Sequence, residues 1–179
     1  MHIVIDYRPA LRERTGVGEY VHQIARALAL LARDDHTGDR ITLFSSSWKD
    51  RLSNPADFEA PVEIVDRRMP VRVLNYLWHR RGWPPVERFV AGPVDVAHSP
   101  HPLLHPSRGV RAVTIHDLDF LAHPERTTRE IRRDYPALVR AHAHRADLIV
   151  VSSRFGASEV ARELGVEPDR IVVCPAGAP

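Results

Sequence analysis

Apolar positions along the chain fall into two kinds of segment: short continuous runs and longer stretches with helical spacing. Short apolar runs are typical of buried strands, and apolar residues three or four positions apart are typical of helices. The runs predict strands over residues 3–6, 41–44, 62–65, 94–97, 110–115, 148–151 and 171–173. The helical spacing predicts helices over residues 17–33, 71–78, 86–91, 127–145 and 153–164.

Strand and helix segments alternate through most of the sequence. Continuous apolar strands indicate burial on both faces, as in a parallel sheet that is covered by helices. The alternation predicts a doubly wound α/β domain with a mainly parallel sheet flanked by helices. In such domains ligands bind beyond the carboxyl ends of the strands, so site residues are expected there.

Length and composition fit one soluble globular domain. The chain has 179 residues, of which 44% are hydrophobic and 27% are charged, and this argues against disorder. No apolar run approaches the roughly 18 residues that span a bilayer. The first residues do not have the pattern of a signal peptide. Cys174 is the single cysteine, so an internal disulfide is impossible and we expect a cytoplasmic protein.

The charge of the chain limits its partners. The net charge is only +2, and apart from Lys49 every basic residue counted in it is arginine. The 23 acidic residues balance the arginines and no recognition motif is present, so nucleic acid is not expected as a partner. Arginines gather around residues 67–81 and 126–145. They are either the solvated faces of core helices or a peripheral contact with the anionic inner face of a membrane.

A glycine pair follows the first predicted strand. Gly16, Val17 and Gly18 lead into a helix, where glycine lets the backbone approach a ligand and the helix N-terminus favours an anion. A plain turn that starts a helix would look the same. The third glycine of a dinucleotide fingerprint is missing. Tyr20 lies two residues after Gly18, and we expect it to line the ligand-binding cleft at this edge of the sheet.

His116 and Asp117 follow the fifth predicted strand, which places an imidazole and a carboxylate at a carboxyl end. Histidine titrates near neutral pH and can donate to a hydroxyl or to a developing charge. The alternative is a structural pair that caps the next segment.

Histidines and hydroxyls follow two further strands. The loop after the fourth strand holds His98, His101 and His105, but nearby prolines and the lack of a nearby cysteine argue against a metal. We expect the three histidines, His98 in particular, to line a polar cleft rich in phosphate or hydroxyl groups; the alternative is that they simply lie in solvent. Ser153 and Arg154 follow the sixth strand, where they bind phosphate or hydroxyl oxygens or form an ordinary N-cap.

Six segments, in this order, resemble the N-terminal domain of retaining glycosyltransferase family 4, and together they span nearly the whole chain. They are Ile5-Asp6-Tyr7-Arg8, Thr15-Gly16-Val17-Gly18-Glu19-Tyr20, Asp95-Val96-Ala97-His98-Ser99-Pro100, Val113-Thr114-Ile115-His116-Asp117-Leu118, Ala146-Asp147-Leu148-Ile149-Val150-Val151-Ser152 and Arg170-Ile171-Val172-Val173-Cys174-Pro175-Ala176-Gly177. The resemblance implies a GT-B fold, in which two Rossmann-like domains face each other across a cleft.

The resemblance also implies roles for residues. Gly16, Val17 and Gly18 would lie near the donor diphosphate, and His116 would face the reacting sugar as the catalytic residue. The donor would be a nucleotide-diphosphate sugar, with no metal or other cofactor. This half would bind the acceptor, which in the family is a lipid-linked, glycan or small-molecule acceptor, and a hexose would be transferred with retention.

The expected domain organisation follows from the same resemblance. Residues 1–174 form the acceptor-side domain, residues 175–179 begin a linker, and the C-terminal donor-binding domain is its missing partner. The 179-residue chain alone is then expected to be inactive. The alternative is a stand-alone, non-catalytic binding module with the same half fold. A sugar-nucleotide epimerase shares the architecture, but the glycine loop and residues 115–117 fit a transferase better.

Overall fold

The computed structural model describes residues 1–11, 16–34, 38–52, 58 and 60–177. Within them the strands are β1 (His2–Asp6), β2 (Arg40–Ser46), β3 (Glu63–Arg67), β4 (Val96–Ser99), β5 (Val110–Thr114), β6 (Leu148–Val151) and β7 (Ile171–Val173). The α-helices are α1 (Val17–Asp34), α2 (Val71–Tyr76), α3 (Asp119–Ala122), α4 (Arg129–Arg145) and α5 (Arg154–Leu164). Short 3-10 or π-helical turns are η1 (Arg8–Ala10), η3 (Leu77–Arg81), η4 (Val86–Arg88), η5 (Pro124–Arg126) and η6 (Pro168–Arg170).

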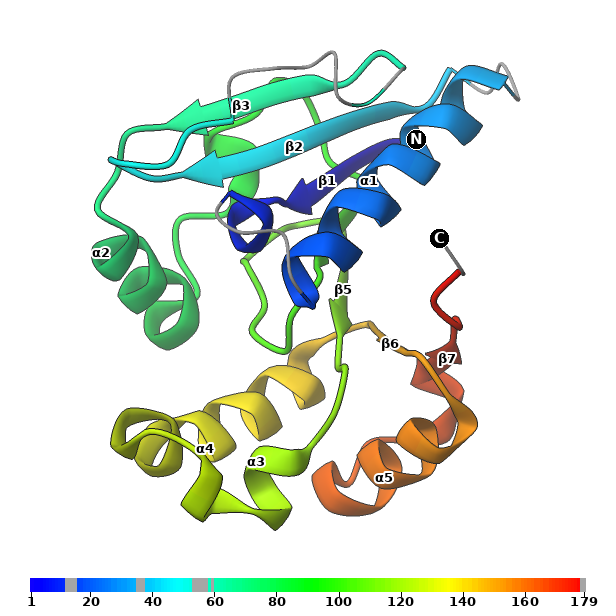
Figure 1. Cartoon of the computed structure of the whole chain (residues 1–179). Coiled ribbons are helices and arrows are strands. Elements are labelled where there is room, and N and C mark those ends of the chain that lie inside the picture. The colour runs from blue at the N-terminus through cyan, green and yellow to red at the C-terminus, as the bar shows by residue number, and fades with distance from the viewer. Residues whose placement is uncertain (12–15, 35–37, 53–57, 59, 178–179) are drawn as a thin grey trace.

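The strands form one sheet in the order β3-β2-β1-β4-β5-β6-β7, and every neighbouring pair is parallel. The chain runs outward from β1 to β3, returns to the other side of β1 at β4, and then runs outward to β7 (Figure 1). Right-handed crossovers in opposite directions place helices on opposite faces of a sheet. The predicted doubly wound α/β fold is therefore confirmed, and the sheet is wholly parallel.

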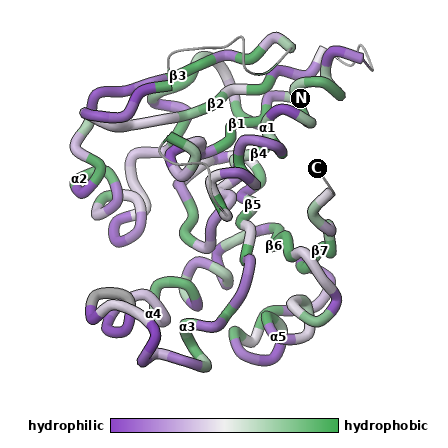
Figure 2. Tube along the Cα trace, in the orientation of Figure 1, coloured by the Kyte–Doolittle hydropathy of each residue, from purple (hydrophilic) through white to green (hydrophobic). Residues whose placement is uncertain are grey.

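Apolar side chains of adjacent strand residues supply cores on both faces of the sheet, because successive side chains point to opposite sides. Ile5 packs with Val21 and Ala25 of α1 on one face. Its neighbour Val4 packs with Trp78 of η3 on the other. A further cluster joins β5 and β6 to α4 and α5, and Figure 2 shows hydrophobic colour along β6 and β7. The helices are thus fixed against the sheet around the carboxyl edge.

Most predicted elements are present, with shifted ends. Residues 148–151 and 171–173 are strands as predicted. The predicted helix over residues 71–78 continues through the π-helical turn η3 to Gly82, whose φ is 63°. The predicted strand over residues 94–97 lies two positions later, because β4 pairs with β1 through residues 96–98. The predicted helix over residues 86–91 is only the single turn η4.

Candidate functional site

Three strand ends converge at the carboxyl edge of the sheet. β1 ends at Asp6, β4 at Ser99 and β5 at Thr114, and these strands are neighbours in the order β1-β4-β5. Because all strands are parallel, the loops that follow them leave from the same edge. The loop after β4 and the loop after β5 meet here, and the first turns of α1 reach the second loop through Tyr20.

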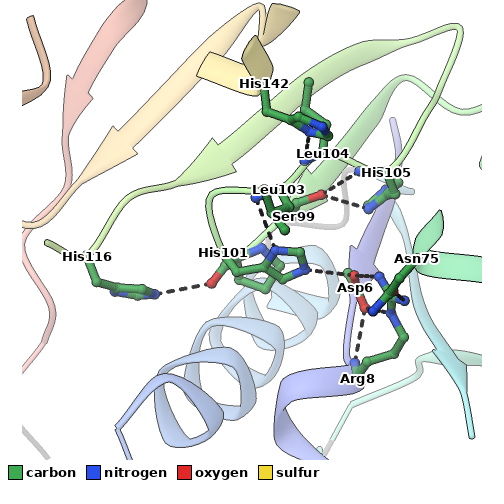
Figure 3. Close-up of polar contacts among 11 residues, drawn as sticks. Asp6, Arg8, Asn75, Ser99, His101, Leu103, Leu104, His105, His116 and His142 are labelled. Atoms are coloured by element: carbon green, nitrogen blue, oxygen red, sulfur yellow. Dashed lines mark hydrogen bonds and ion pairs between the residues drawn. The ribbon is translucent and has the colours of Figure 1, made fainter. Parts of the chain in front are cut away.

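His116 is held by two neighbours. Its Nε2 lies 3.1 Å from the backbone carbonyl oxygen of Pro100 (Figure 3). A carbonyl only accepts, so Nε2 carries a proton, and in the neutral ring Nδ1 then keeps its lone pair. The ring of Tyr20 meets the His116 ring edge to face, with centroids 4.8 Å apart and an interplanar angle of 85°. In the described part of the chain no hydrogen bond engages Nδ1, which can therefore accept one from a ligand.

Tyr20 connects this histidine to the glycine turn. The backbone N–H of Tyr20 donates to the carbonyl of Gly16 over 3.1 Å. Gly16 has a φ of +53°, and a Cβ there would meet no described atom within 4 Å, so glycine serves the left-handed backbone rather than close packing. Val17 is exposed as the first residue of α1, and Gly18 is buried in its first turn. Thr15 lies outside the described residues.

His98 lies on the buried side of the site. Its Nε2 is 2.9 Å from the hydroxyl oxygen of Thr114, two residues before His116. Burial lowers the pKa of His98 to about 4, and nearby His101 and His116 act in the same direction. His98 is therefore an uncharged hydrogen-bonding partner within the sheet at neutral pH. Burial raises the pKa of Tyr20, which the Thr114 hydroxyl opposes.

The remaining predicted residues have local structural roles. Asp117 is exposed, and its Oδ1 accepts from the backbone N–H of Asp119 at the start of α3, over 3.1 Å. Ser153 is the N-cap of α5 and accepts from the backbone N–H of Gly156 over 3.0 Å. Arg154 begins that helix and is exposed. No contact between described side chains joins these residues to His116, whereas Tyr20 touches its ring directly.

Asp6 and Arg8, to which the sequence alone assigned no role, form a buried ion pair at the carboxyl edge of the sheet. The side chain of Asp6 is fully buried, and both of its carboxylate oxygens accept from the Arg8 guanidinium, at 2.8 and 2.6 Å. Arg8 also donates to Asn75 of α2 over 2.6 Å and lies 4.8 Å above the Trp78 ring. The ring of His101 contacts the same carboxylate over 3.0 Å (Figure 3).

The charge of Asp6 is stabilised by these partners. Burial alone would raise the pKa of Asp6, but the Arg8 guanidinium and the hydrogen bond with His101 hold it well below its usual range. The signal in the sequence was a carboxylate closing an apolar strand, followed two residues later by an arginine. A strand-end carboxylate is as much a part of the carboxyl edge as the loop that follows it.

The described ranges hold neither a candidate metal-binding cluster nor a helix that could span a membrane. Those ranges contain no cluster of three or more His, Cys, Asp or Glu side chains that could hold a metal ion. Every helix described is too short or too polar to cross a bilayer.

The strand order and the convergence of loops at the carboxyl edge define a Rossmann-like α/β domain. The model of the family described as Glycosyltransferase Family 4 matches residues 14–179, and the chain belongs to this family as the N-terminal half of its GT-B fold. Membership implies a glycosyltransferase, with a sugar donor and an acceptor as substrates. A search of curated proteins found no significant match.

Proposed function

We propose that this domain provides the acceptor side of a retaining hexosyltransferase that uses a nucleotide-diphosphate sugar. The acceptor is a lipid-linked, glycan or small-molecule hydroxyl compound. The observation that carries the proposal is the geometry of His116, whose Nε2 is engaged by the Pro100 carbonyl and whose Nδ1 has a free lone pair. An imidazole in this tautomer accepts a hydrogen bond from a substrate hydroxyl and orients it for transfer.

In this proposal the start of α1 binds the diphosphate of the sugar donor. Gly16, Val17 and Gly18 surround the first turn of an 18-residue helix, whose free N–H groups and dipole favour an anion such as a diphosphate. Tyr20 lies on the same helix and touches His116. The diphosphate and the reacting hydroxyl would therefore bind on either side of Tyr20.

A second domain completes the donor site in this proposal, and no metal or further cofactor is required. Residues 1–174 form the domain proposed here, and residues 175–179 begin the linker, of which residues 178 and 179 lie outside the described structure. The two-domain architecture of the family supports this division. The 179-residue chain by itself would bind acceptor but would not transfer sugar.

A donor and acceptor screen on the two-domain protein, with the His116→Ala variant, tests the proposal. We expect His116→Ala to lower kcat/KM at least about 100-fold, the usual range for losing one positioned proton-transfer or orienting group. His144→Ala, on the exposed face of α4, is the matched control and should retain activity. Near-normal turnover of His116→Ala would remove the role of this residue. Acceptor binding without transfer from any donor would favour the stand-alone binding module instead.

The surface of α2 supports a peripheral contact with an anionic membrane from the cytoplasmic side. Val73 and Tyr76 are 51% and 53% exposed, and Arg72 and Arg81 are exposed around them. The Arg81 guanidinium lies 5.9 Å from the Tyr76 ring centre. Exposed apolar and aromatic groups among arginines suit the interface of an anionic bilayer.

The opposite side of α2 and η3 is buried, as expected for a core helix with a solvated arginine face. Leu74 and Trp78 are fully buried in the core, so this side of the segment faces the sheet. The proposed membrane contact therefore uses only the outer face of α2 and η3, together with Trp83 just beyond them, which is 55% exposed.

A further inference from the structure

The acceptor for the His116 ring proton is a backbone carbonyl, so what fixes that carbonyl also fixes the ring. The carbonyl belongs to Pro100, and the next residue is His101. We propose that His101 is a positioning residue for His116: its bond to buried Asp6 fixes the Pro100 carbonyl and so maintains the Nε2–H tautomer of His116. The catalytic consequence rests on the proposed function, whereas the effect on the tautomer does not.

Both ring nitrogens of His101 are used for anchoring. The backbone N–H of Leu103 donates to Nδ1 over 3.2 Å, so Nδ1 carries no proton. The proton is therefore on Nε2, which donates to the Oδ2 of Asp6 over 3.0 Å (Figure 3). The ring is uncharged in this arrangement, and the bond is charge-assisted because the acceptor is a carboxylate. His101 thus joins the loop after β4 to the end of β1.

The carboxylate at the other end of this bond is immobilised. Asp6 is fully buried, and it accepts two hydrogen bonds from the Arg8 side chain and a third from the Arg8 backbone N–H. Arg8 is in turn bonded to Asn75 and stacked on Trp78. His101 is therefore attached to a rigid point.

The rest of the loop is held independently. His105 exchanges hydrogen bonds with the hydroxyl of Ser99, and the backbone N–H of Leu104 donates to Nδ1 of His142. Figure 3 shows these contacts on the far side of the loop from His116. They fix the start of the loop at Ser99 and its middle at residues 104 and 105, and the bond of His101 is the anchor next to the Pro100 carbonyl.

The prolines on either side make this anchor effective. A proline ring fixes the φ of Pro100 and of Pro102, and a residue that precedes proline is itself restricted. Few backbone torsions near His101 are free to compensate if its backbone rotates. Such a rotation therefore changes the direction of the Pro100 carbonyl. Without that acceptor the proton of His116 can move to Nδ1, which then no longer accepts from a substrate hydroxyl.

The tautomer of His116 can be measured in the 179-residue chain itself by two-bond proton–nitrogen NMR correlations. Labelled histidine is used, and the spectrum of His116→Gln assigns the signals. We expect a single Nε2–H form in the unmodified chain. His101→Asn keeps an acceptor for Leu103 but is too short for Asp6, so the Nε2–H form should fall to about half or less. His101→Gln still reaches Asp6 with an amide N–H and should restore it.

The controls make each outcome decisive. His144→Ala leaves the His116 signals unchanged if the effect is specific, and thermal unfolding verifies that every variant is folded. A folded His101→Asn chain with an unchanged Nε2–H signal overturns the proposal, as does a His101→Gln chain that loses it. If His101→Asn does not fold, His101→Leu in the folded temperature range replaces it, with the same two readings.

Turnover by the two-domain protein separates this inference from the proposed function. His101→Asn should lower kcat about 10- to 100-fold with little change in KM, because misplacing a group near the reaction has this effect. His101→Gln should recover most of kcat. If the tautomer changes while kcat does not, the catalytic role of His116 is wrong and the positioning of its ring by His101 stands.

Discussion

Asp6 and Arg8 place a complete ion pair beneath the site, where solvent cannot screen it. The side chain of Asp6 is fully buried and that of Arg8 is only 11% exposed. A buried pair of this kind gains little net stability over an apolar pair, but removal of one partner leaves an uncompensated charge. The pair is therefore better understood as a fixed point for His101 than as a source of stability.

Arg8→Met tests how far the carboxylate depends on its partner. The methionine keeps much of the packing on Trp78 but leaves Asp6 buried and unpaired, so we expect a loss of about 3–5 kcal/mol in the free energy of unfolding. Urea denaturation at pH 7 measures it. The double variant Asp6→Asn, Arg8→Met should recover a large part of the loss. A cost of less than about 1 kcal/mol for Arg8→Met would show that the pair is solvated.

Residue-level chemistry was predictable from the sequence only where it is local. His116 and Tyr20 both lie in segments that follow a predicted strand, and their rings are in contact. The contact of Asp6 with His101 joins positions 95 apart and depends on the backbone of a proline-rich loop. Neither periodicity nor spacing encodes that contact, so from the sequence His101 was expected only to line a polar cleft or to lie in solvent.

At the scale of elements, cap chemistry was the most reliable guide. The sequence offered an N-cap at Ser153, and α5 has Ser153 as its N-cap. The helix ends at Gly165, which adopts the left-handed conformation with a φ of 67°. The 3-10 turn η1 and the single-turn helix α3 were not predicted, because neither is long enough to show periodicity. The Asp117 carboxylate accepts a hydrogen bond from the backbone N–H of Asp119, the first residue of α3.

Charge reversal on the outer face of α2 and η3 tests the proposed membrane contact. Arg72→Glu with Arg81→Glu should reduce flotation of the chain with vesicles containing anionic lipid at least about 10-fold at low salt, because each arginine near such a surface contributes about 1 kcal/mol. Arg108→Glu with Arg162→Glu is the charge-matched control on other surfaces and should float better.

The salt dependence of flotation is part of the same test. Electrostatic binding should weaken between 0.05 and 0.5 M salt, because the screening length falls below about 10 Å near 0.1 M. Absence of flotation at low salt would contradict the membrane contact. If both double variants lose flotation equally, binding depends on the overall charge of the chain and not on the outer face of α2 and η3.

For the whole molecule, the buried histidines determine how stability responds to acid. Burial lowers the pKa of His79 to about 3 and the pKa of His98 and His105 to about 4. The unfolded chain binds these protons near pH 6.5, the ordinary value for histidine. Their contribution is therefore present in full above pH 6.5 and is lost as the pH falls towards 4. The pKa of Asp6 is also lowered in the folded chain, so its contribution to stability is also lost on acidification. This loss occurs only at lower pH, because the ordinary pKa of the carboxyl is already near 3.8.

We therefore expect the free energy of unfolding to fall between pH 6.5 and 4.5, by about 1.4 kcal/mol per pH unit for each fully buried histidine. Urea denaturation across this range measures the slope. His105→Gln removes one of the buried histidines and should flatten the slope, whereas His144→Gln, at an exposed position, should not. A slope that is identical in the unmodified chain and in His105→Gln would show that His105 is protonated in the folded state.

The pairing of β1 with β4 also determines the order in which the chain can fold. β1, β2 and β3 pair through nearby segments, as do β4 to β7, but the two halves of the sheet join only where β1 meets β4. About 90 residues separate these two strands, so a ribosome needs on the order of ten seconds after completing β1 to produce its central partner. During that interval the inner edge of β1 is unpaired and can attract other strands. The bond of Asp6 to His101 spans the same junction, so the site forms only when the two halves have docked.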